Sequence, residues 1–94
     1  MVEIRFETGE KYRIMDPSET WEGIGLEELT YLGREKQVDY FLDKSGRFVK
    51  IDPKMICAFS EEDKAFSVSS ICVIQRGCLT EPQRSTIGKL GVEL

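Results

Sequence analysis

The segment "VDYFLDKSGRFVKIDP", residues 38–53, has the pattern of two strands joined by a tight turn. Apolar and polar side chains alternate on both sides of the polar stretch "DKSG", as they do in a half-buried β-hairpin. The turn has two residues if it consists of Ser45 and Gly46, and four if it runs from Lys44 to Arg47. Both turns give the same pairing of the two strands, which makes this hairpin the centre of the predicted sheet.

The length of the turn fixes which side chains share a face, since a shift of one residue turns every side chain of a strand over. A three-residue turn places Lys50 and Asp52 among Leu42 and Tyr40, which mixes charged and apolar side chains. We therefore predict the even turn. It produces one fully apolar face, which consists of Val38, Tyr40, Leu42, Val49 and Ile51.

In this register the second face carries two aromatic rings, Phe41 and Phe48, with Phe41 opposite Lys50. Burial of a Phe stabilises a protein by roughly 1.5 to 3 kcal/mol, so a small protein exposes such rings only where they have a use. Aromatic rings are enriched in protein interfaces and also stack on unpaired bases. The alternative is that the C-terminal segment covers both rings. Acidic side chains on the same face repel phosphate and favour a protein partner over nucleic acid: Asp39, Asp43 and Asp52.

Other segments predict further short elements. Residues 2–7 and 11–14 alternate like a hairpin with a loop at 8–10, which sets Phe6 opposite Tyr12. Residues 16–23 have the spacing of a capped helical turn, and residues 26–36 fit a strand better than a helix, with a turn at 33–36. A single helical turn at 53–56, a strand at 56–60, an acidic loop at 60–64 and one or two strands within 65–77 complete the pattern. Thr80 and Gln83 have the spacing of a helix start.

Five or more short strands, with a helical turn before a late strand, predict an all-β, β-rich fold with little α-helix. The layout of residues 9–60 resembles SH3-like and Sm-like small barrels, which implies a partly open antiparallel barrel with short helical turns. A chain of 94 residues is long enough for one domain only, so residues 1–94 form a single domain. Its last part, residues 80–94, is either a docked or a loose tail.

The composition limits the surface chemistry. With 40% hydrophobic and 32% charged residues the chain is globular, and its net charge of −4 argues against a phosphate-binding surface over the whole protein. The segment between Arg34 and Lys54 reverses this balance, with six basic and four acidic residues and a net charge of +2. The beginning of the chain predicts no secretory signal, and no stretch is apolar enough for a membrane span. We therefore expect a cytoplasmic protein that makes no membrane contact.

The residue types also limit the catalytic chemistry. The chain has no histidine, which removes the commonest general base and most transition-metal sites. Three cysteines without histidine are a poor zinc set, so we expect no metal and no cofactor. Cys57 and Cys72 lie in apolar stretches and are expected to behave as small hydrophobic residues. Cys78, near Arg76 and a helix start, is either a spectator or an activated thiolate. We expect no enzyme.

The predicted function is protein–protein interaction, either as a homo-oligomer formed by strand edges or as an accessory or inhibitory subunit of a larger complex. Trp21 is either a plug at one end of the barrel or an exposed binding residue. The expected partner contacts are Trp21, Phe41, Lys44, Arg47, Phe48 and Lys50.

Two alternatives remain open. The first is a nucleic-acid-binding barrel that uses the basic central hairpin, with binding that weakens steeply in salt. The second is an acidic decoy that imitates a row of phosphates with carboxylates of the first third of the chain: Glu3, Glu7, Glu19, Glu22, Glu27 and Glu28.

Overall fold

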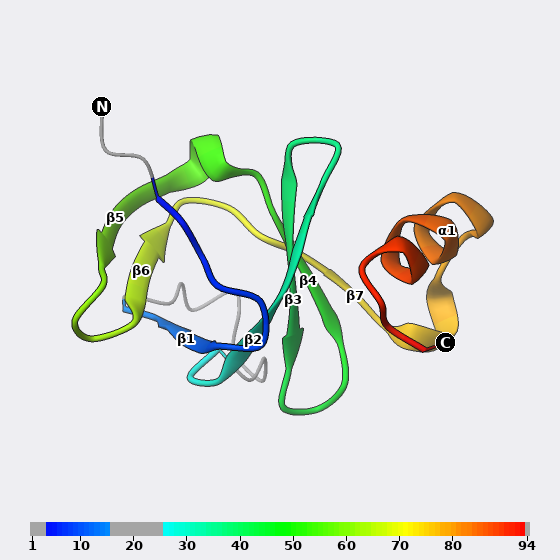
Figure 1. Cartoon of the computed structure of the whole chain (residues 1–94), viewed down its shortest axis with the longest axis horizontal. Coiled ribbons are helices and arrows are strands. Elements are labelled where there is room, and N and C mark those ends of the chain that lie inside the picture. Colours follow the sequence, from blue (N-terminus) through cyan, green and yellow to red (C-terminus); the bar gives the residue numbers. More distant parts are fainter. Residues whose placement is uncertain (1–3, 16–25, 94) are drawn as a thin grey trace.

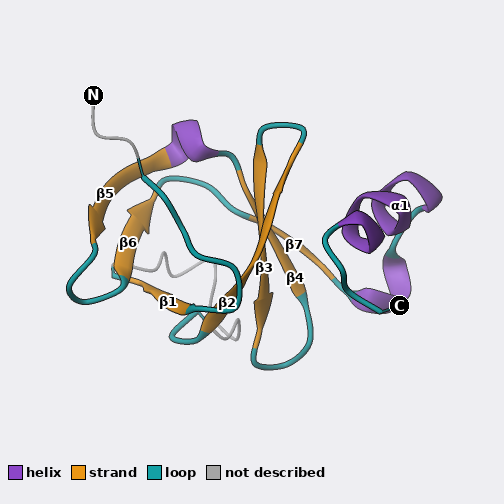
Figure 2. Cartoon of the chain, viewed as in Figure 1, coloured by secondary structure: helices purple, strands orange, loops and turns teal. Residues whose placement is uncertain are grey.

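The computed structural model describes residues 4–15 and 26–93 (Figure 1). Strands dominate these residues, and one α-helix lies near the C-terminus (Figure 2). The strands are β1 (Lys11–Ile14), β2 (Leu29–Glu35), β3 (Val38–Asp43), β4 (Phe48–Ile51), β5 (Ile56–Ser60), β6 (Ala65–Val68) and β7 (Cys72–Ile74). The helices are the short 3-10 helices η2 (Pro53–Met55) and η3 (Arg76–Cys78) and the α-helix α1 (Glu81–Lys89).

The seven strands form one curled sheet with the order β5-β6-β1-β2-β3-β4-β7 (Figure 1). Neighbouring strands are antiparallel except β1 and β6, which pair in parallel. The curl produces a half-barrel with β5 and β7 at its two ends. A small, mostly β, barrel-like domain was predicted, and this part of the prediction is confirmed.

The sheet carries a hydrophobic core on each face. The concave face holds an aromatic cluster around Phe6, whose ring centroid lies 4.9 to 5.4 Å from five other rings. The opposite face of the β3–β4–β7 end packs against α1 and the residues after it. We call the first cluster the inner core and the second the helix core. The helix core is built on the buried residues Tyr40, Phe48, Ile74 and Ile87.

The register of the central hairpin differs from the predicted one by one residue. Phe41 pairs with Val49 and Leu42 with Phe48, which requires a three-residue turn at residues 44–46. Every side chain of β4 is therefore turned over relative to the prediction. Phe41 and Phe48 lie on opposite faces of the sheet, and the fully apolar face that the even turn produces does not exist.

The side chain of Asp43 explains why the odd turn is adopted. Its carboxylate is buried and accepts hydrogen bonds from the backbone N–H groups of Ser45 at 2.9 Å and Arg47 at 2.8 Å. Arg47 Nε donates to the other oxygen at 3.0 Å. Gly46 has a φ of 88°, the left-handed conformation that ends a three-residue hairpin turn. These hydrogen bonds form inside the turn. Their stabilisation exceeds the cost of placing charged and apolar side chains on the same face of the hairpin, which was the reason for predicting the even turn.

Two other predictions about the strands are wrong. Residues 4–7 form no strand, and β1 pairs with β2 and β6 instead. Phe6 still contacts Tyr12, at 4.9 Å between ring centroids, because its ring enters the inner core. The turn between β2 and β3 consists of Lys36 and Gln37, both with positive φ, and so does not span residues 33–36. Gly33 belongs to β2 beside a bulge, where an added Cβ would lie 2.8 Å from Leu90 Cδ2.

The later elements match the prediction. The strand at 29–35, the helical turn η2, the strand β5 and the division of residues 65–77 into two strands are all present. Helix α1 begins after Thr80, and the Thr80 and Gln83 side chains form the predicted capping box. The C-terminal segment is docked, since Ile87 is fully buried and Leu90 packs on the helix core. The helical turn predicted at 16–23 lies outside the described residues.

Candidate functional site

The two rings predicted to contact a partner are both buried. Phe41 and Phe48 are each 0% exposed. Phe48 lies under the C-terminal segment with Ile87, as the alternative has it. Phe41 does not, because it belongs to the inner core on the other face of the sheet. The guanidinium of Arg76 also lies over the Phe48 ring, 5.1 Å from its centroid. Neither ring is available to a partner, so this part of the predicted interface is wrong.

The predicted cationic contacts do not gather at one place. Lys44 is exposed and forms an ion pair with Glu27. Arg47 is bound to the buried Asp43 at 3.0 Å, where it holds the turn. Lys50 is half-buried and lies away from the turn, near the start of β7. Trp21 lies outside the described residues.

The structure brings a different set of residues together, at the ends of β2–β3 and β4–η2. Two cavities of about 310 Å³ and 290 Å³ lie next to each other and share the lining residues Val38 and Asp52, so we treat them together as one groove. We call it the basic groove. It continues the helix-core face of β3 and β4 past the part that α1 covers. Its lining residues are Arg34, Lys36, Gln37, Val38, Lys50, Asp52, Pro53, Lys54, Met55, Ser70, Ile71 and Cys72.

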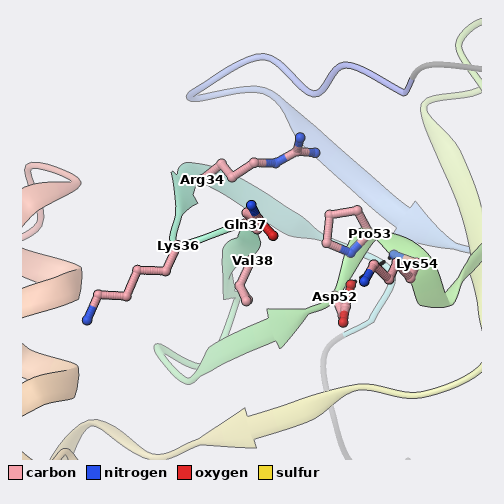
Figure 3. Close-up of a pocket in the computed structure, with 7 residues that line it drawn as sticks. All are labelled: Arg34, Lys36, Gln37, Val38, Asp52, Pro53 and Lys54. Atoms are coloured by element: carbon pink, nitrogen blue, oxygen red, sulfur yellow. Dashed lines mark hydrogen bonds between the residues drawn. The ribbon is translucent and has the colours of Figure 1, made fainter.

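Figure 3 shows the end of the basic groove between the β2–β3 turn and η2. Gln37 and Val38 come from the turn and the start of β3, and Asp52 and Pro53 face them from the end of β4 (Figure 3). The Lys36 side chain extends away from the other six residues and lies at the rim (Figure 3). At the other end of the groove, Met55 is exposed at 40% and adds apolar surface.

The charge of the groove is positive. It contains four cationic residues and the carboxylate of Asp52, so its formal charge is +3. Arg34 is neutralised by Asp39, at 2.9 Å from Nε to Oδ1. Within residues 4–15 and 26–93 no ion pair involves Lys36, Lys50 or Lys54. Asp52 Oδ1 accepts the backbone N–H of Lys54 at 3.0 Å, which caps η2.

A buried ionic network supports one wall of the groove. Asp39 is fully buried, and Arg34 binds it with both Nε, at 2.9 Å, and Nη2, at 3.1 Å. Tyr31 Oη donates to Asp39 Oδ1 at 2.8 Å. Burial is the main cause that raises the pKa of Tyr31 above its ordinary value of 10.0, and the hydrogen bond to Asp39 adds to it. The network joins β2 to β3 next to the turn that carries Lys36 and fixes the position of that turn.

The raised pKa of Tyr31 predicts a loss of stability in alkaline solution. The folded protein keeps the phenol proton above pH 10, whereas the unfolded chain loses it near its ordinary pKa of about 10. The protonated Tyr31 hydroxyl therefore contributes its full stabilisation below about pH 10. This stabilisation is lost as the pH rises towards the pKa of Tyr31 in the folded protein. Urea unfolding at increasing pH will show the free energy of unfolding falling above about pH 10.

The matched variant for this prediction is Tyr31→Phe. It will be less stable at neutral pH by about 1.5 to 3 kcal/mol, because a hydrogen bond to a charged group is lost. Its free energy of unfolding will fall less between neutral and alkaline pH than that of the wild type. Tyr40, whose pKa is also raised by burial, is present in both proteins and does not affect the difference. If the free energy of unfolding fell equally with pH in the wild type and in Tyr31→Phe, Tyr31 would ionise in the folded protein as readily as in the unfolded chain.

The cysteines and acidic residues place further limits on the site. Cys57, Cys72 and Cys78 are all exposed, so the apolar stretches around Cys57 and Cys72 do not enclose their thiols. Among the described residues no group of three or more cysteine, aspartate or glutamate side chains has the arrangement of a metal site. None of the described helices combines the length and apolar character that crossing a membrane requires.

Two of the carboxylates that would imitate phosphate are engaged with lysine. Glu28 lies 2.7 Å from Lys11 Nζ, and Glu27 is paired with Lys44. Hydrogen bonds to these ammonium groups lower the pKa of both carboxyls. Glu3, Glu19 and Glu22 lie outside the described residues. Of the three carboxylates of this set that the structure describes, Glu27 and Glu28 are therefore paired with lysine, and Glu7 is exposed.

The chain matches no protein-family model, no curated protein and no solved structure. The assignment of a function therefore rests on the basic groove. A sequence signal for the groove exists: the net charge of +2 between Arg34 and Lys54. Of the three predicted cationic contacts, Lys50 lines the groove, whereas Lys44 and Arg47 lie at the tip of the hairpin and are paired with Glu27 and Asp43.

Proposed function

We propose that this protein is a non-enzymatic protein-interaction module that binds an acidic segment of a partner protein in the basic groove. The observation that carries the proposal is a set of three lysines that line one groove and form no ion pair with any described residue, in a chain of net charge −4: Lys36, Lys50 and Lys54. Opposite charges across an interface speed association and exclude partners of the wrong charge. An accessory or inhibitory subunit would use such a groove to dock on a larger complex.

The lining of the groove supports a protein partner over nucleic acid. Binding of unpaired bases relies on aromatic side chains on which the bases stack, and none of the residues that line the groove is aromatic. Val38, Met55 and Ile71 instead offer apolar surface beside the lysines. A peptide with acidic and apolar side chains satisfies both features, whereas a polyphosphate makes no use of the apolar surface.

The proposal extends to the setting of the protein. The helical turn η2 before β5 supports a layout like that of SH3-like and Sm-like barrels over residues 9–60. The three exposed cysteines without a disulfide support a reducing compartment, and we place the protein in the cytoplasm on that ground. Such small barrels serve many unrelated functions, so the groove and not the fold defines the activity.

The test is a titration of isotope-labelled protein with an oligoglutamate peptide, followed by backbone amide NMR shifts. We expect the largest shifts at residues 36–38 and 50–54, and progressive loss of binding as salt is added. The variant Lys36→Glu with Lys50→Glu should weaken binding by about tenfold or more, which corresponds to at least about 1.4 kcal/mol. The matched control reverses two exposed cations of α1, Arg84→Glu with Lys89→Glu, and should bind as the wild type does.

A second titration, with single-stranded oligothymidylate, separates the two partner classes. Binding of oligothymidylate at the same residues, tighter than that of oligoglutamate, would replace the proposal by the nucleic-acid alternative. A nuclease-treated cell lysate provides the biological check, because a partner protein should be retained by the wild type and the α1 variant but not by the groove variant. Equal retention by all three proteins would contradict the proposal.

A further inference from the structure

The strand β5 forms one end of the sheet, and within residues 4–15 and 26–93 it pairs only with β6. Figure 1 shows it at the outer side of the half-barrel. None of its five residues is charged or a proline, which are the residues that usually protect an edge strand from pairing with another chain. Cys57 and Ala58, at its centre, are exposed and have small side chains that allow another strand to approach.

Charges of opposite sign flank the strand. Lys54 lies before β5, and Glu61 and Glu62 follow it. All three side chains are exposed, and none of them forms an ion pair within the described part of the chain. The edge is therefore positive at one end and negative at the other. Two copies of such an edge are complementary when they run in opposite directions, and that is the arrangement a two-fold axis produces.

We infer that β5 pairs in an antiparallel manner with β5 of a second copy of this chain, around a two-fold axis at Ala58. Within the strand, Ile56 then faces Ser60 of the second copy and Cys57 faces Phe59. Beyond the paired strands, Lys54 in η2 of one copy and Glu62 in the turn after β5 of the other lie at the same end of the seam, and the same two charges meet again on the other side of the axis. Neighbouring strands lie about 4.8 Å apart, which brings the oppositely charged ends of the two edges close together. The two curled sheets become one continuous sheet.

The bulge at Cys57 is the feature of β5 that opposes this pairing. Ile56 faces Val68 and Ala58 faces Ser67, so Cys57 is an extra residue without a partner on β6. A bulge bends an edge strand and discourages pairing. The bulge lies within one residue of the proposed axis, so it affects both copies in the same way. It leaves Ala58–Ser60 in regular register with β6.

Sedimentation equilibrium over a range of protein concentrations tests the inference by charge reversal. The wild type should be in monomer–dimer equilibrium, and Lys54→Glu or Glu62→Lys alone should weaken the dimer by about tenfold or more, because each places like charges opposite each other twice. The double variant carrying both changes restores the opposite charges and should dimerise as the wild type does. Both positions are exposed, so circular dichroism should show that all the variants are folded.

The three exposed cysteines provide an independent measurement with matched controls. Single-cysteine proteins that retain only Cys57, only Cys72 or only Cys78 are treated with a short bis-maleimide cross-linker. The Cys57 protein should form a covalent dimer, since its thiol lies beside the proposed axis, and the other two should react far less. The Cys57 protein with Ala58→Pro should not cross-link, because the proline ring disturbs the paired strand.

Three outcomes would overturn the inference: a monomer at every concentration, a dimer that neither charge reversal weakens, or cross-linking through Cys72 or Cys78 in preference to Cys57. The first would show that the bulge is sufficient to protect the edge. The groove variant Lys36→Glu with Lys50→Glu should dimerise normally, since neither residue lies on the β5 edge. Failure of the dimer and failure of the acidic-peptide binding are therefore distinguishable.

Discussion

Replacement of Phe41 by alanine will lower the free energy of unfolding by about 3 to 5 kcal/mol, the usual cost of removing a buried phenylalanine ring. Phe41 is 0% exposed, and its ring centroid lies 5.1 Å from that of Phe6, 5.2 Å from that of Tyr31 and 5.6 Å from that of Phe66. The substitution leaves a cavity among rings held by strands and by the N-terminal segment. Urea unfolding followed by circular dichroism measures the change.

The control is Met55→Ala, at an exposed apolar residue of the basic groove. This variant should lose little stability, since most surface substitutions change it by no more than about 0.5 kcal/mol. Phe41→Ala will also reduce partner binding in proportion to the unfolded fraction, and binding should return at a lower temperature. A stable Phe41→Ala variant would show that the ring does not belong to the inner core.

Replacement of Asp39 by alanine will lower the free energy of unfolding by about 1.5 to 3 kcal/mol, because the Tyr31 and Arg34 side chains lose their hydrogen bonds to a buried charged group. The change leaves the Arg34 guanidinium and the Tyr31 hydroxyl without their shared acceptor. The loss should appear as a lower urea midpoint with an unchanged dependence on denaturant. Asp52→Ala, which removes an exposed carboxylate, should cost about 0.5 to 2 kcal/mol, as loss of a helix cap does.

A double-mutant cycle gives the coupling between the two charges directly. If Arg34→Ala and Asp39→Ala together cost no more than Asp39→Ala alone, the two residues act as one unit. Strictly additive costs would show that the buried carboxylate is stabilised by groups other than Arg34. The basic groove should also change shape in the Asp39 variant, since the turn that carries Lys36 adjoins the network.

The fold class was predictable from local pattern. Alternation in β3 and β4, the β-branched residues of β6 and β7, and the capping box at Thr80 each act within a few residues, and each produced a correct element. The register of the central hairpin was not predictable from alternation, because Asp43 forms hydrogen bonds inside the turn that the apolar pattern does not contain. An aspartate that begins a turn with glycine three positions later is the signal that could have indicated it.

The candidate site was less predictable than the fold. A shift of one residue moved Phe41 and Phe48 from one shared surface to two different cores, and with them the predicted interface. The basic groove combines residues from the β2–β3 turn, η2 and the start of β7, which are distant in sequence. Residues 4–7 looked like a strand by alternation, but only the three-dimensional arrangement shows that Phe6 fills the half-barrel while β6 takes the place beside β1.

The central hairpin belongs to both cores at once, and this predicts a hierarchy of local opening. Phe41 anchors one face of the hairpin and Phe48 the other, so its backbone amides exchange only when both cores are lost. Helix α1 belongs to the helix core alone, and its release uncovers Phe48 while the aromatic cluster stays closed. Hydrogen exchange should therefore separate two cooperative units, with α1 opening first and the β3–β4 amides protected to the free energy of global unfolding.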